Sequence, residues 1–136
     1  MKTLKTLVRL AKFNVDDKRR VLAEVMAQVD AVQSRIDALE ASVEHERKVA
    51  SETPDLGPVF GQYAARAKAD RTTMEKQLEA LQPYVDQARD QLAEAFEEQK
   101  KYEITKDRRD EADRQDLDRK DQAVLDEVGL QAHRQK

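Results

Sequence analysis

The sequence predicts an all-α protein: a long antiparallel two-helix coiled-coil hairpin whose second helix overhangs the first. Three observations predict this class. Residues that build globular cores are scarce, since the 136 residues include no Trp or Cys, and charged residues make up 39%. Apolar residues recur at a mean spacing of about 3.5 positions in two long stretches. Between these stretches lies SETPDLGPVFG, residues 51–61, which holds two of the three prolines and two of the three glycines.

A first helix is predicted over about residues 2–51. Steps of four and three residues from Leu4 reach apolar side chains at twelve of fourteen positions. Such a repeat keeps one stripe of a helix facing a partner helix, which is typical of a coiled-coil seam. The stripe consists of Leu4, Val8, Ala11, Val15, Lys18, Leu22, Val25, Val29, Val32, Ile36, Leu39, Val43, Glu46 and Ala50.

A turn is predicted over about residues 52–58. Pro54 and Pro58 cannot continue a helix interior, but both suit a first helical turn. Gly57 can take backbone angles closed to other residues. The alternative for this segment is an open hinge between two extended helices.

A second helix is predicted over about residues 58–134. The same stepping from Phe60 to Tyr102 meets apolar residues at eleven of thirteen positions, counting Tyr. Beyond Ile104 the stripe fades and returns weakly at Leu117, Val124 and Val128, which predicts a largely polar overhanging tail. Pro83 is expected to kink this helix from an outward position, without breaking the seam.

The two stripes fit each other in an antiparallel register whose facing residue numbers sum to about 110, so Val43 meets Ala67 and Ile36 meets Met74. Large residues then face small ones in several layers, which favours one hairpin domain over residues 1–136 and a monomer. The predicted coiled-coil core is Val15, Leu22, Val25, Val29, Val32, Ile36, Val43, Met74, Leu78, Leu81, Val85 and Leu92.

Four long polar residues interrupt the stripes: Lys18, Glu46, Arg71 and Gln99. One interpretation is that they fix the register or mark a contact site. The other is that their long side chains reach solvent from a thin two-stranded core at little cost.

Composition and motifs argue against several function classes. His45 and His133 lack spaced partners for a metal, no Gly-rich phosphate loop occurs, and a two-helix rod offers no pocket for catalysis. We therefore expect no enzyme activity, no cofactor and no small-molecule ligand.

Residues 1–20 carry a net charge of +5, but no nucleic-acid-binding fold or aromatic platform accompanies them, so no nucleic-acid partner is expected. No apolar run is long enough to span a membrane, and the absence of Cys suits a reducing cytoplasm.

Three stretches resemble a known family. The opening TLKTLVRLAKFNVDDKRRVLAEVM resembles the start of the flagellar FliJ family, the coiled-coil component of the type III export apparatus. The stretch from Gly61 to Arg108, GQYAARAKADRTTMEKQLEALQPYVDQARDQLAEAFEEQKKYEITKDR, is similar to the second helix of that family, and LDRKDQAVLDEVGLQAHR resembles its polar tail. The resemblance covers nearly the whole chain.

The resemblance implies a stalk that acts in bacterial flagellum biogenesis and protein export. It implies that the end carrying both termini engages the export ATPase ring, that the surface near the hairpin touches the export gate, and that export chaperones are escorted. It also implies a cytoplasmic protein, peripheral at the cytoplasmic face of the membrane. The implied gate contacts are Leu39 and Tyr63, although Ser42 and Glu46 stand where the family surface has tyrosines. The implied ring contacts are Lys2, Leu4, Lys5, Leu7, Arg9, Leu10 and Lys12.

Two other functions stay open. The chain is alternatively a generic structural coiled coil, a parallel homodimer with residues 51–61 as its hinge. A third interpretation is a membrane-surface helix at the N-terminus, suggested by alternating Leu and Lys. Leu7 and Leu10 lie off the seam, so they are expected to be partly exposed unless the tail covers them.

Overall fold

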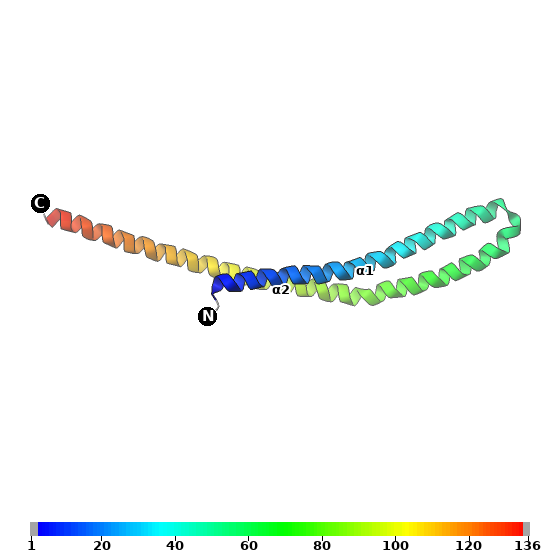
Figure 1. The fold of residues 1–136 in the computed structure, drawn as a ribbon, viewed down its shortest axis with the longest axis horizontal. Coiled ribbons are helices and arrows are strands. Elements are labelled where there is room, and N and C mark those ends of the chain that lie inside the picture. The colour runs from blue at the N-terminus through cyan, green and yellow to red at the C-terminus, as the bar shows by residue number, and fades with distance from the viewer. Residues whose placement is uncertain (1–2, 135–136) are drawn as a thin grey trace. The chain divides into compact units, whose positions relative to one another are not determined.

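The computed structural model describes residues 3–134, and nearly all of them lie in two long helices. Helix α1 (Leu4–Glu52) has 49 residues, the 3₁₀ helix η1 (Pro54–Leu56) follows, and α2 (Gly57–Arg134) has 78 residues. The two helices pack against each other as a hairpin, and residues 3–134 contain no strand (Figure 1). The predicted all-α hairpin class is therefore confirmed, and the open hinge is wrong.

The chain divides into two units. The hairpin unit is Asp16–Glu94, and the terminal unit consists of Met1–Val15 together with Ala95–Lys136. Each unit contains a part of α1 and a part of α2.

The core of the hairpin unit is a single line of residues between the two helices. Its buried side chains, Val32, Ile36, Ala67, Val85 and Ala88, all belong to the predicted stripes. The other predicted core residues of this unit are half-buried because one facing helix cannot cover a side chain on all sides. They are Leu22, Val25, Val29, Val43, Met74, Leu78, Leu81 and Leu92.

Contacts between the two helices of this unit agree with the predicted register. Arg35 Nη2 donates a hydrogen bond to Gln77 Oε1 at 3.0 Å, and Arg71 forms an ion pair with Glu40. In both pairs the residue numbers sum to nearly 110, as the alignment of the stripes requires. Helix α2 runs through Pro83, whose ring is exposed.

The terminal unit continues the seam and then leaves it. Ala11, Val15 and Ala95 are buried, with Val15 only 2% exposed. Beyond Lys106, every described residue of α2 is exposed. Figure 1 shows α2 extending past the start of α1, so the exposed residues 114–134 lie beyond the part of α2 that lines a hollow with Thr3, Leu4 and Lys5.

The turn is made by Thr53 and Pro54 rather than by Gly57. Thr53 has extended backbone angles, its N–H donates to the carbonyl oxygen of Ala50 at 3.3 Å, and its own carbonyl accepts from Leu56 N–H at 3.0 Å. Gly57 does not use the backbone freedom of glycine, because its φ of −55° and ψ of −50° are helical. One extended residue followed by a proline that starts η1 reverses the chain without a left-handed residue.

Candidate functional site

The N-terminal end of α1 is held by a side-chain cap. The backbone N–H of Thr6 donates to Oγ1 of Thr3 at 3.2 Å, and the N–H of Leu7 donates to the Thr3 carbonyl oxygen at 3.1 Å. The Thr6 bond satisfies one of the N–H groups that a helix start leaves open, and the Leu7 bond is the first backbone bond of the helix itself. The residues that follow are thereby set on defined faces of α1.

The predicted ring-contact residues fall into two groups. Leu4 and Leu7 are half-buried, whereas Leu10 is 47% exposed. Lys5, Arg9 and Lys12 are exposed, and Lys2 lies outside the described residues. The tail does not cover Leu10, so the expectation that this side chain is partly exposed is confirmed.

Lys5, Arg9 and Lys12 form a basic face on one side of α1, because their spacing of four and three residues keeps them in one row. They line a hollow of about 300 Å³ together with Val8 and with Lys106 from α2. No carboxylate lines this hollow. None of the three residues of the basic face forms an ion pair with another described residue.

Lys106 brings a fourth cation to the basic face. Its Nζ donates to Oδ2 of Asp110 at 2.6 Å, and this hydrogen bond raises the pKa of Lys106, so it stays charged at neutral pH. A neighbouring hollow of about 480 Å³ contains Lys5, Lys106 and Arg109 beside Asp110 and Asp113. Positive charge is thus supplied by both helices of the terminal unit.

Phe13 is the most exposed large apolar residue of the chain's described part, at 69%. It lies three residues after Leu10, so the two side chains share a face of α1. That face lies next to the basic face and away from the seam residues Val8 and Ala11. The sequence reasoning missed Phe13, although its place off the stripe is the same signal that singled out Leu10.

In the hairpin unit, Leu39 lines a hollow of about 300 Å³ between the helices. Val43, Ala64 and Ala67 complete its apolar wall. The hollow exists because two alanines of α2 face larger residues of α1 without filling the space between them. Glu40 and Arg71 stand at its rim.

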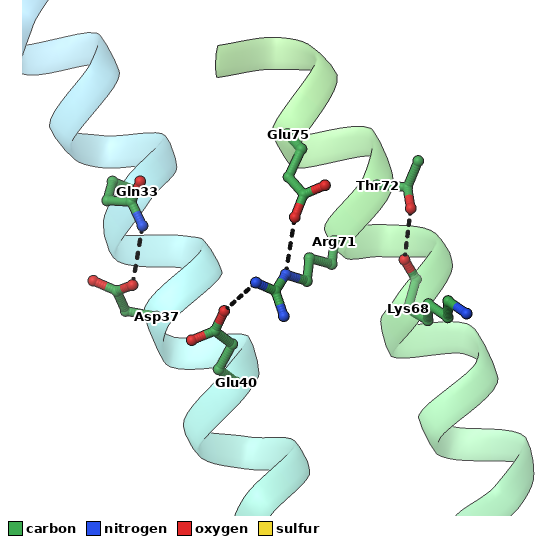
Figure 2. A network of polar contacts seen from close by, with 7 residues as sticks. All are labelled: Gln33, Asp37, Glu40, Lys68, Arg71, Thr72 and Glu75. Carbon is green, nitrogen blue, oxygen red and sulfur yellow. Dashed lines mark hydrogen bonds and ion pairs between the residues drawn. The ribbon is translucent and has the colours of Figure 1, made fainter. Parts of the chain in front are cut away.

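Figure 2 shows the polar network at this rim. Arg71 Nη2 lies 2.7 Å from Glu40 Oε1 across the hairpin, and its Nε donates to Glu75 Oε1 on its own helix at 3.0 Å. Both pairs are about half-exposed. A seam position that the stripe predicts to be apolar is therefore occupied by a cation held by two carboxylates.

Tyr63 lines a different hollow, of about 360 Å³, near the turn. The structure does not bring Leu39 and Tyr63 into one site, because each belongs to a separate hollow. Glu46, a seam exception, lies beside Tyr63, whereas exposed Ser42 lines neither hollow. Apolar side chains dominate the rest of the Tyr63 hollow: Val49, Ala50, Leu56, Val59 and Phe60.

Comparison with protein families settles the relationship of this chain. The model of the family described as "Flagellar FliJ protein" matches residues 1–136. The chain belongs to the FliJ family. The resemblance of the three sequence stretches is therefore confirmed.

Curated relatives agree with this assignment to the FliJ family. "Flagellar FliJ protein" of Caulobacter vibrioides strain NA1000 / CB15N is 36% identical over 98 residues, which are 72% of this chain and 70% of the relative. The protein of the same name from Caulobacter vibrioides strain ATCC 19089 / CIP 103742 / CB 15 matches with the same identity and coverage. No solved structure matches the chain significantly. Membership in the FliJ family assigns this chain a role in flagellum biogenesis related to export.

The described residues of this FliJ-family chain contain neither a metal-binding group nor a membrane-spanning helix. No three or more His, Cys, Asp or Glu side chains among residues 3–134 are grouped so that they could hold a metal ion. Within the same range, no helix is both long and apolar enough to cross a bilayer. The features that remain as candidate sites of this FliJ-family chain are surfaces: the basic face with Leu10 and Phe13, the Leu39 hollow and the Tyr63 hollow.

Proposed function

We propose that this chain is a non-enzymatic coiled-coil stalk of the flagellar type III export apparatus, which engages the export ATPase ring with its terminal unit. The exposed pair Leu10 and Phe13 carries the proposal, because large apolar side chains left uncovered beside unpaired cations are typical of a contact surface. The half-buried Leu4 and Leu7 add apolar area to this end of α1, and Lys5, Arg9 and Lys12 provide charge that attracts an acidic partner.

The hairpin unit is proposed to contact the cytoplasmic domain of the export gate. Leu39 and Tyr63 line two hollows that a partner side chain can enter. The gate contact then consists of two points rather than one patch. Because Glu46 lies in the Tyr63 hollow, a basic or amide group of the gate suits that point better than a carboxylate.

Escort of export chaperones is the third part of the proposal. It places the protein in the cytoplasm and, through the apparatus, at the cytoplasmic face of the membrane. A purified chaperone that binds the chain and is released when the gate domain is added supports this role. A chaperone that does not bind the chain, with or without the ATPase present, contradicts it.

ATPase turnover of the purified export ATPase tests the stalk function. Addition of the chain is expected to raise turnover, and Leu10→Asp is expected to reduce this rise because it places a charge in an apolar contact. Val59→Asp is the matched control, since Val59 is also exposed but lies in the hairpin unit. Unchanged turnover on adding the unaltered chain contradicts the stalk function.

A further inference from the structure

We infer that the terminal unit also binds an anionic phospholipid surface, with lipid phosphates at the basic face and with Leu10 and Phe13 in the headgroup region. The inference does not rest on the ring contact proposed above. Because both partners would use one face of α1, a bilayer and the ATPase ring could not occupy it together.

The first observation is the charge of the basic face. Lys5, Arg9 and Lys12 are exposed and unpaired within the described chain, and Lys106 reaches the same hollow from α2. Asp110 pairs with Lys106, and Asp110 and Asp113 share the neighbouring hollow with Lys5, whereas no carboxylate lines the hollow that holds Arg9 and Lys12. Such a group attracts phosphates, and each Lys or Arg near an anionic membrane contributes about 1 kcal/mol, roughly fivefold in binding.

The second observation is the uncovered apolar pair beside this charge. Leu10 is 47% exposed and Phe13 is 69% exposed, and the seam residues lie on a different face of α1. Around the circumference of α1, the basic face lies between the seam and the face that carries Leu10 and Phe13. A helix with Lys or Arg beside Leu and Phe lies in the interface of a membrane, with the cations at the phosphates and the apolar side chains below them.

The local architecture suits a flat partner. Val8, Ala11 and Val15 lie in the seam with α2, so the opposite side of α1 is free to meet a surface while the helix stays paired. No folding step is then needed for binding, which avoids the entropic cost that a disordered membrane anchor pays. The acidic residues Asp16 and Asp17 follow directly after this surface and limit it to the first four turns of α1.

Vesicle flotation with the full chain tests the inference. Large vesicles of equal parts phosphatidylglycerol and phosphatidylcholine are expected to carry the chain upward at low salt, whereas pure phosphatidylcholine vesicles are not. Binding is expected to fall as salt rises, because mobile ions screen the charges. No flotation with the anionic vesicles at low salt overturns the inference.

Matched charge variants locate the surface. The triple variant Lys5→Gln, Arg9→Gln, Lys12→Gln is expected to bind anionic vesicles roughly a hundredfold more weakly, from about fivefold for each cation. The control triple Arg66→Gln, Lys76→Gln, Arg89→Gln makes the same change in net charge on exposed residues of the hairpin unit. Equal losses in both triples would show that net charge alone drives binding and would overturn the site.

A second pair of variants tests the apolar contribution. Phe13→Ser is expected to weaken binding about tenfold, whereas Tyr84→Ser, at a 62% exposed position of the hairpin unit, is expected to leave it unchanged. Circular dichroism checks that each variant is folded. We expect all of them to fold, because the substituted side chains are exposed.

A competition experiment with inorganic phosphate at constant ionic strength distinguishes lipid phosphates from free phosphate as the ligand of the basic face. If millimolar phosphate does not displace the chain from anionic vesicles, the lipid surface is the ligand. Displacement would mean that the basic face takes free phosphate, and the lipid assignment would be wrong. The stalk function is measured without lipid, so its success or failure is distinguishable from this result.

Discussion

Arg71 of α2 and Glu40 of α1 form an ion pair across the hairpin, with 2.7 Å between Nη2 and Oε1. Arg71 holds a seam position and lines the Leu39 hollow, and its guanidinium also contacts Glu75 on its own helix, as Figure 2 shows. The side chain is about half-exposed and also pairs with the opposite helix.

The strength of this pair is measurable by a double-mutant cycle. Arg71→Gln and Glu40→Gln are expected to show a coupling energy of about 0.5 kcal/mol in urea unfolding, since both side chains are about half-exposed. Asp37→Asn replaces Glu40→Gln in the control cycle, because Asp37 bonds to Gln33 and not to Arg71. A coupling near zero would show that Arg71 does not contribute to the register.

Ile36 tests the seam. It is 4% exposed, and Ile36→Ala is expected to lower the free energy of unfolding by about 2 to 4 kcal/mol through lost burial and a cavity. Val59→Ala, at a 62% exposed position, is expected to change it by less than about 0.5 kcal/mol. Similar effects of the two substitutions in thermal or urea unfolding would contradict the observed seam.

Gly57 tests the backbone of the turn. Its helical angles suit alanine, and no atom lies within 4 Å of the position that a Cβ would take. Gly57→Ala is therefore expected to stabilise the chain by about 0.4 to 1 kcal/mol by reducing the entropy of the unfolded state. Gly61→Ala, inside α2 and equally free of neighbours, is expected to have a similar effect. Destabilisation by Gly57→Ala alone would indicate that the turn needs a left-handed glycine.

Glu44 supplies a test of pH dependence. Arg47 Nη2 and Nε donate hydrogen bonds to its carboxylate at 2.7 and 3.0 Å, and they lower the pKa of Glu44 from its ordinary value of 4.5. The stabilising contribution is then complete above the ordinary pKa and is lost as pH falls through the lowered one. Carboxyl NMR titration is expected to show a higher pKa for Glu44 in Arg47→Gln than in the unaltered chain, and equal values would mean that the pair does not form in solution.

A distance measurement checks the direction of the helices and the expected monomer. The chain has no Cys, so Ala31→Cys and Ala80→Cys allow two spin labels on exposed positions that line one hollow of the hairpin unit. Labels within roughly 20 Å are expected, from a helix separation of about 10 Å plus the label tethers. The solution mass is expected to be that of one chain of 15.6 kDa. Twice this mass would contradict the monomer, and labels far apart within one chain would contradict the hairpin.

Most of the fold was predictable because it depends on a local repeat. A spacing of 3.5 residues places Val15, Ile36 and Val85 on inner faces whatever the rest of the chain does, and these residues are buried. Less of the candidate surfaces was predictable. Leu10 was found because it departs from the repeat, but Phe13 was missed, and the separate hollows lined by Leu39 and Tyr63 could not be read from the repeat.

The sequence by itself determined the helical class, the position of the turn and the identity of the seam, because helix periodicity and proline chemistry act over a few residues. Only the tertiary structure decided how well each layer is filled, since that depends on the pairing of side chains far apart in the sequence. It showed that Ala64 and Ala67 leave a hollow beside Leu39, and that Lys106 joins the basic face. It also showed that Gly57 is helical, because Thr53 and Pro54 already reverse the chain.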